Sequence, residues 1–169
     1  YPMVDDIAVG EATSNDVTAI AEFFREAWRQ AGPDAPGFAG ATEEVIAEIS
    51  TPEAIEARIG GPDRRMFLAH SGGAVVGFSA SRRLTSETVE LAGIVVLQYM
   101  VGRGIGRPLA KAAVQSARSN GFTRMVVSTE VDNERALGFY RALGFVPTSV
   151  SAIVAEGEPV EVQNLELAL

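Results

Sequence analysis

The sequence predicts one α/β (or α+β) domain over residues 1–169, with a mixed, mostly antiparallel seven-stranded sheet and helices on both faces. Three observations support this fold class. The chain has 169 residues, 47% of them hydrophobic, which suits one domain with a sizeable core. Strand and helix patterns follow in the order β-α-α-β-β-β-α-β-α-β-β. The strand–helix–strand run from Glu90 to Val131 requires a parallel pair, whereas the hairpins require antiparallel pairs.

The N-terminal part predicts one strand followed by helices. Residues 7–13 fit a short strand, and Thr13-Ser14-Asn15-Asp16 is a capping-box pattern that begins a helix over residues 14–30. A loop rich in Gly and Pro, residues 32–40, leads to a second helical region over residues 42–59. That region is interrupted at Thr51-Pro52, where proline can open a new helix.

The rest of the chain predicts six strands and two helices. Gly72-Gly73 is a two-residue hairpin signal, Asn120-Gly121 a helix stop, and Gly93 in mid-strand indicates a β-bulge. The expected strands are 65–71, 74–82, 88–97, 125–131, 145–155 and 160–169, and the expected helices are 106–119 and 133–143, the latter ended by Gly144.

Charge and composition exclude several function classes. A net charge of −8 argues against sequence-independent nucleic-acid binding, so no nucleic-acid partner is expected. The chain has no Cys and one His, which excludes Cys nucleophiles and Cys/His metal sites, so we expect no metal. The sequence has no apolar run near the roughly 18 residues that span a membrane and no signal-peptide pattern at its start. We therefore expect a cytoplasmic protein with no membrane partner.

An apolar strand leads through a glycine-rich loop directly into a helix. The strand segment 94–97 does not alternate with polar residues, which predicts that both its faces are covered. Gly102, Gly104 and Gly106 then occupy every second position. Backbone N–H groups at a helix N-terminus bind anions, and glycine permits close approach, so the loop predicts a phosphate or pyrophosphate site. A tight turn without ligand explains the loop alone equally well, and its spacing fits neither a P-loop nor a Rossmann fingerprint.

A second pattern lies about thirty residues downstream. Asn133, Ala136 and Tyr140 stand at i, i+3 and i+7 and share one helical face. A small residue between an amide and a phenol leaves room on that face for an elongated ligand. An ordinary helix with core aromatics is the alternative interpretation.

The two motifs together resemble those of the Gcn5-related N-acetyltransferase (GNAT) superfamily. Arg103-Gly104-Ile105-Gly106 is similar to its acetyl-CoA pyrophosphate loop, and Asn133-x-x-Ala136-x-x-Phe139-Tyr140-x-x-x-Gly144-Phe145 to its second CoA motif. The predicted order of elements also matches that fold over essentially the whole chain. One departure is Val101, which stands where the family usually has Arg or Gln. It costs a side-chain contact at most, because the loop works mainly through backbone N–H groups.

The resemblance implies an N-acetyltransferase that uses acetyl-CoA as co-substrate and moves the acetyl group to a primary amine by direct attack. The backbone of the central strand would bind the pantetheine, the glycine loop the pyrophosphate, and Asn133 the pantetheine arm. Arg103 and Arg107 would add charge to the phosphates, and Tyr140 would protonate the leaving thiolate. The implied cofactor-binding residues are Val95, Val96, Leu97, Gly102, Arg103, Gly104, Ile105, Gly106, Arg107, Asn133, Ala136, Phe139 and Tyr140.

Glu90 is the candidate general base that the amine requires. It lies fourteen residues before Gly104, where members of the superfamily often place a catalytic glutamate, and its neighbours Val89 and Leu91 predict partial desolvation. Glu87 and a water molecule are alternative bases. An exposed carboxylate at a strand end is the other interpretation of Glu90.

The acceptor is a small-molecule or peptide amine whose identity the sequence leaves open. The chain's acidity is compatible with a cationic amine, which Asp34, Glu43, Glu44 and Glu48 could attract, although a solvated helix face explains these residues too. The resemblance places Phe38 in the region that shapes the acceptor pocket.

Other functions remain as alternatives to the enzyme. A non-catalytic acetyl-CoA-binding or sensing module would have the same fold. A tRNA-directed acetyltransferase is disfavoured by the net charge, and a Rossmann nucleotide-binding protein by the glycine spacing. Because the last strands of similar proteins often form dimer contacts, a homodimer is one state to test.

Overall fold

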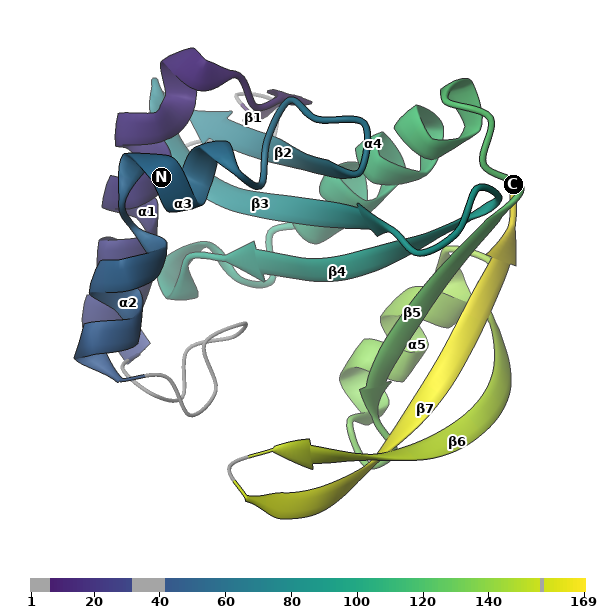
Figure 1. Cartoon of the computed structure of the whole chain (residues 1–169). Coiled ribbons are helices and arrows are strands. Elements are labelled where there is room, and N and C mark those ends of the chain that lie inside the picture. Colours follow the sequence, from purple (N-terminus) through teal and green to yellow (C-terminus); the bar gives the residue numbers. More distant parts are fainter. Residues whose placement is uncertain (1–6, 32–41, 156) are drawn as a thin grey trace.

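The computed structural model describes residues 7–31, 42–155 and 157–169 (Figure 1). One seven-stranded sheet runs through it in the order β1-β2-β3-β4-β5-β7-β6. Only the β4–β5 pair is parallel, and the other neighbouring strands are antiparallel, so the predicted mixed sheet is confirmed. The strands are β1 (Ile7–Glu11), β2 (Arg64–Ser71), β3 (Ala74–Arg83), β4 (Thr88–Val96), β5 (Arg124–Glu130), β6 (Val146–Ala155) and β7 (Glu158–Ala168).

Helices cover both faces of the sheet, as predicted. On one face Phe24 of α1 packs edge-on against Phe78 of β3, with ring centroids 5.6 Å apart. On the other face Ser79 Oγ donates to the Leu109 carbonyl of α4 at 2.9 Å. None of the helices in the described residues is long and apolar enough to cross a membrane. The helices are α1 (Val17–Ala31), α2 (Glu43–Ile49), α3 (Pro52–Glu56), α4 (Gly106–Ser119) and α5 (Glu134–Ala142), with short 3-10 turns η2 (Ser14–Asp16) and η4 (Gln98–Met100).

Local sequence signals set most of the element boundaries. The capping box is formed, because Thr13 Oγ1 accepts from the Asn15 N–H and the Thr13 N–H donates to Asp16 at 2.8 Å. Most observed bounds differ from the predicted ones by one or two residues, and one of these differences needs a reason. β7 begins at Glu158 instead of residue 160, so Pro159 lies inside a strand. Pro159 is tolerated there because β5 pairs with β7 only from Val162 onward, which leaves this end of β7 hydrogen-bonded on one side.

The sheet consists of two halves that are joined for only a short distance. β4 and β5 pair from Thr88–Arg124 to Glu90–Val126 and then diverge, as Figure 1 shows. The β3–β4 register shifts directly after this point, where Ala92 is the extra residue of a β-bulge next to Gly93. The predicted bulge is therefore confirmed, and it coincides with the parting of the two strands.

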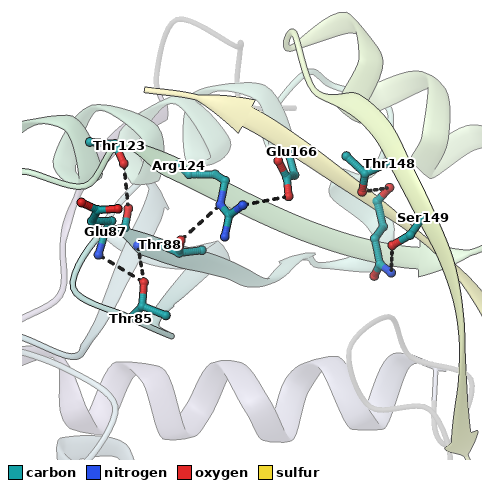
Figure 2. A network of polar contacts seen from close by, with 9 residues as sticks. Thr85, Glu87, Thr88, Thr123, Arg124, Thr148, Ser149 and Glu166 are labelled. Carbon is teal, nitrogen blue, oxygen red and sulfur yellow. Dashed lines mark hydrogen bonds and ion pairs between the residues drawn. The ribbon is translucent and has the colours of Figure 1, made fainter.

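Polar side chains reinforce the end at which β4 and β5 are paired (Figure 2). Arg124 donates to Thr88 Oγ1 through Nε at 3.2 Å and to Glu166 of β7 through Nη1 at 3.4 Å. The Thr123 N–H donates to the Glu87 carbonyl at 2.9 Å. These contacts tie β4, β5 and β7 together where few parallel backbone pairs connect the halves, so the opposite end can stay open.

Candidate functional site

The diverging part of β4 offers backbone groups that β5 no longer pairs. The Leu97 N–H donates to the Val76 carbonyl at 2.9 Å, and the Leu97 carbonyl accepts from Met100 at 2.8 Å. Backbone groups of alternate residues point to the same neighbouring strand, so Val95 faces β3 as well. Ile94 and Val96 therefore turn their N–H and C=O groups toward the side that β5 has left.

This geometry bears on which backbone groups can serve the predicted pantetheine site. Val95, Val96 and Leu97 were all expected to offer backbone groups, yet those of Leu97 are used inside the protein and Val95 faces β3. Val96 keeps its predicted role as a proposal, and Ile94 joins it. The sequence indicates a bulge but not which residue is the extra one, and this choice sets the alternation after it.

The glycine loop has the backbone geometry of an anion site. Gly102 and Gly104 have φ angles of +85° and +77°, in the left-handed region that residues with a side chain rarely adopt. Ile105, the N-cap residue of α4, makes no capping hydrogen bond through its side chain. The first N–H groups of a helix have no partner within it, so those of Gly106 and Arg107 are offered to a ligand.

The second motif lies directly beside this loop. A Cβ built on Gly106 would stand 3.5 Å from ring atoms of Phe139 in α5 and 3.9 Å from the Ile94 side chain in β4. The start of α4, the middle of α5 and the diverging part of β4 therefore meet at Gly106. The fold brings together the two motifs that stand about thirty residues apart in the sequence.

Asn133 has a structural role in addition to its predicted role in binding the pantetheine arm. Its Oδ1 accepts from the Ala136 N–H at 3.1 Å, which makes Asn133 the N-cap of α5. The cap fixes the side chain with its amide oxygen toward the helix. The amide Nδ2, which carries two donors, is the group left for a pantetheine contact.

Tyr140 sits among aromatic rings at the end of α5. Its ring lies edge-on to Phe139 and Phe145, with centroid distances of 5.3 and 5.7 Å. Gly144, at φ +99°, ends the helix and lets the Phe145 N–H donate to the Tyr140 carbonyl at 3.1 Å. Burial raises the pKa of the Tyr140 hydroxyl, which therefore stays protonated at neutral pH. That is the form a general acid needs.

Glu90 stands where β4 and β5 part and faces a cleft. It is the last β4 residue paired with β5, and its side chain is 29% exposed. Arg82 of β3 donates to Glu90 Oε1 at 3.0 Å. Glu90 lines a cleft of about 350 Å³, whereas Glu87 lines a different one of about 380 Å³ at the paired end. This placement favours Glu90 over Glu87 as the base.

Of the residues expected to attract a cationic amine, Glu43, Glu44 and Glu48 do not line the Glu90 cleft. Phe38 and Asp34 lie outside the described residues. Glu43 lines another hollow of about 1220 Å³ between α1, α2 and the β2–β3 hairpin. Arginines that the sequence did not single out line the Glu90 cleft instead, namely Arg58, Arg64, Arg65 and Arg82. Only the strand alternation of β3, which puts Arg82 on the Phe78 face, hints at this.

The described residues hold no group of three or more His, Asp or Glu side chains placed to bind a metal ion. The candidate site combines four other features. They are two strands, β4 and β5, that separate at a bulge, a glycine loop whose backbone can bind an anion, a protonated tyrosine, and a carboxylate where the strands separate. This combination defines a class of proteins that bind an elongated, phosphate-bearing ligand against a strand edge.

The profile of the Acetyltransferase (GNAT) family matches residues 18–145, well over half of the chain. The chain therefore belongs to this family of acetyltransferases. Its fold is shared with yncA of Salmonella typhimurium, solved with acetyl-CoA, at a TM-score of 0.72 and 22% identity over 96% of this chain and 93% of that one. A PaiA N-acetyltransferase of Thermoplasma acidophilum, solved with coenzyme A, has a TM-score of 0.68 and 18% identity over 96% and 99%.

Sequence relatives match over shorter stretches. N-alpha-acetyltransferase RimI of Mycobacterium tuberculosis is 35% identical over 97 residues, 56% of this chain and 60% of that protein. N-alpha-acetyltransferase 30 of Schizosaccharomyces pombe is 34% identical over 73 residues, 43% of this chain and 49% of its own length. A mycothiol acetyltransferase of Jonesia denitrificans is 37% identical over 62 residues, 37% of this chain, and only 20% of that protein is covered. The chain thus spans half or less of the length of these last two relatives.

Proposed function

We propose that the protein is an acetyl-CoA-dependent N-acetyltransferase that moves the acetyl group to a primary amine by direct attack. The observation that carries this proposal is the parting of β4 and β5 after Glu90, which leaves Ile94 of the diverging strand beside Gly106 of the glycine loop and Phe139. Acetyl-CoA supplies an activated acyl group. The chain supplies backbone groups along Ile94 and Val96 for the pantetheine and the uncapped start of α4 for the pyrophosphate.

The proposed reaction needs one base and one acid from the protein. The amine nitrogen forms a bond to the thioester carbonyl carbon, and the carbon–sulfur bond breaks. Glu90 accepts the proton that the amine loses, directly or through one water. Tyr140 donates its hydroxyl proton to the departing thiolate, which its raised pKa permits at neutral pH. No covalent enzyme intermediate is required.

An acceptor screen with acetyl-CoA, monitored by the release of free thiol, tests this function. The panel includes small amines and peptide N-termini, because two of the relatives are named N-alpha-acetyltransferases. We expect turnover of at least one amine that depends on both Glu90 and Tyr140. Binding of acetyl-CoA without turnover across the panel would instead identify a non-catalytic binding or sensing module.

We also propose a homodimer through β6. This strand is one of the two edges of the sheet and exposes four branched apolar side chains: Val146, Val150, Ile153 and Val154. An edge strand also presents unpaired backbone groups, so a second copy paired along β6 would cover both. Sedimentation velocity at micromolar concentration is expected to show a dimer that Val154→Lys weakens, and a monomer of the unmodified protein contradicts the proposal.

A further inference from the structure

The cleft beside Glu90 carries positive charge in an otherwise acidic protein. We call it the arginine cleft and define it by Arg58, Arg64, Arg82 and Glu90, with Phe24 and Phe78 as its apolar wall. Arg65 also borders it, but its guanidinium donates to Glu11 at 2.8 Å and to Asn120 at 3.2 Å. Three guanidinium groups thus face one carboxylate, although the whole chain has a net charge of −8.

Strand register places these charges in a row. Arg64 of β2 lies directly opposite Arg82 of β3, and Arg82 lies directly opposite Glu90 of β4. Like charges at directly opposed positions destabilise a sheet, whereas opposite charges stabilise it. The Arg82–Glu90 ion pair therefore has an evident benefit and offsets part of the Arg64–Arg82 repulsion. Arg64 has no opposite charge directly beside it in the row.

Arg58, just after α3, adds to this repulsion. Burial and the nearby charge of Arg64 both lower the pKa of Arg58. Neither Arg58 nor Arg64 forms an ion pair with a residue in the described part of the chain. Two neighbouring guanidinium groups without a counter-charge are what an anionic ligand would stabilise, because the arginine fork matches carboxylate and phosphate oxygens.

We infer that the acceptor is a small amine that also carries an anionic oxyacid group, a carboxylate or a phosphate, bound by Arg58 and Arg64. This inference rests on the proposed function, since Glu90 then takes the proton of the amine at the other end of the same molecule. The cavity of about 350 Å³ suits a small ligand, because pockets of roughly 300–1,000 Å³ hold small molecules.

Matched pairs of amines test the inference. γ-Aminobutyrate is compared with butylamine, and O-phosphoethanolamine with ethanolamine, so that each pair differs in the anionic group. We expect kcat/KM for the anionic member to exceed that of its partner by about tenfold or more. The two pairs distinguish carboxylate from phosphate. Equal values within both pairs, or faster turnover of a peptide N-terminus than of every anionic amine, would overturn the inference.

Variants assign the preference to the arginine cleft. Arg58→Gln and Arg64→Gln are expected to lower kcat/KM for the anionic amine about tenfold each, and to lower kcat/KM for the neutral amine far less. Arg58→Lys keeps the charge but loses the forked guanidinium, so its kcat/KM for the anionic amine should lie between the values of the unmodified protein and of Arg58→Gln. Arg118→Gln, on the exposed last turn of α4, removes one positive charge elsewhere and is the matched control. A loss of equal size in Arg118→Gln would mean that net charge, not the cleft, sets the preference.

Calorimetry separates this inference from the proposed function. γ-Aminobutyrate and O-phosphoethanolamine are titrated into the unmodified protein and into Arg58→Gln, whose fold is checked by circular dichroism. If binding weakens in the variant and no thiol is released from acetyl-CoA, the proposed acetyltransferase function is contradicted and the anion site is supported. If thiol is released with neutral amines and no binding depends on Arg58, the acetyltransferase function is supported and the anion site is contradicted.

Discussion

The two ends of the candidate site use different kinds of chemical group, backbone at one end and side chains at the other. The end proposed for the cofactor consists mainly of backbone: two glycines with positive φ, the uncapped start of α4, and the strand groups that β5 leaves unpaired. The end proposed for the acceptor consists of side chains, namely Glu90 and Arg82 with Arg58 and Arg64. The first can bind the same phosphate-bearing group in every relative with this backbone, whereas the second can change its ligand by substitution alone.

This difference predicts where a mutation acts. Changes at the acceptor end should alter turnover and amine preference while acetyl-CoA still binds. Changes at the cofactor end should alter the affinity for acetyl-CoA only when they disturb the backbone. Tyr140 is the proposed acid and belongs to neither binding end, so its loss should alter the chemical step alone.

Glu90→Gln is expected to have the largest effect. It removes the proposed base but keeps the size of the side chain, and general-base catalysis contributes about a hundredfold or more. We expect kcat to fall by about that factor while the acetyl-CoA dissociation constant, measured by calorimetry, stays unchanged. Glu87→Gln is the matched control, because Glu87 lines the other cleft. If Glu87→Gln carried the loss instead, the assignment of the base would be wrong.

Tyr140→Phe should lower kcat by roughly tenfold or more, because the leaving thiolate loses its proton donor. Tyr99→Phe, at a 56% exposed site, should change nothing. Unchanged turnover in Tyr140→Phe would remove Tyr140 from the acid role.

The pH dependence follows from the raised pKa of Tyr140. Deprotonation of Tyr140 should lower kcat only above about pH 10, the ordinary value for tyrosine, so no loss from this group is expected between neutral pH and that point. The same burial contributes stability that is fully present below about pH 10 and is lost as the pH rises through the folded-state value. A pH–rate profile measured with Tyr140→Phe alongside should lack this alkaline fall in the variant.

The sequence predicted the cofactor end of the site better than the acceptor end. The glycine loop, the start of α4 and the Asn133–Tyr140 face are local patterns, so spacing alone could place them. The arginine cleft draws Arg58 from beyond α3, Arg64 from β2 and Arg82 from β3. No short motif links these residues, since strand register brings them together. The fold was predictable because its strands and helices have clear periodicity, whereas the roles of Val95 and Leu97 depended on one bulged residue.

Gly104→Val tests whether the cofactor end works through its backbone. Valine is strongly disfavoured at φ +77°, and left-handed backbone costs a residue with a side chain about 1–2 kcal/mol, so the loop should shift. We expect the acetyl-CoA dissociation constant to rise roughly tenfold, with kcat at saturation largely kept. Gly10→Val is the control, because a Cβ at exposed Gly10 meets nothing within 4 Å. An equal change in both variants would mean that the loop conformation is irrelevant to binding.

Arg107→Gln should have the smallest effect of these changes and sharpens the comparison most. Arg107 is exposed in the first turn of α4, and an exposed ion pair is worth about 1 kcal/mol or less. The acetyl-CoA dissociation constant should therefore rise no more than about fivefold, and the rise should shrink as salt is added. Arg118→Gln in the last turn of the same helix should leave it unchanged. A loss in Arg107→Gln larger than that in Gly104→Val would place the cofactor contact in side chains, and the proposed division between a backbone-built and a side-chain-built end would no longer hold.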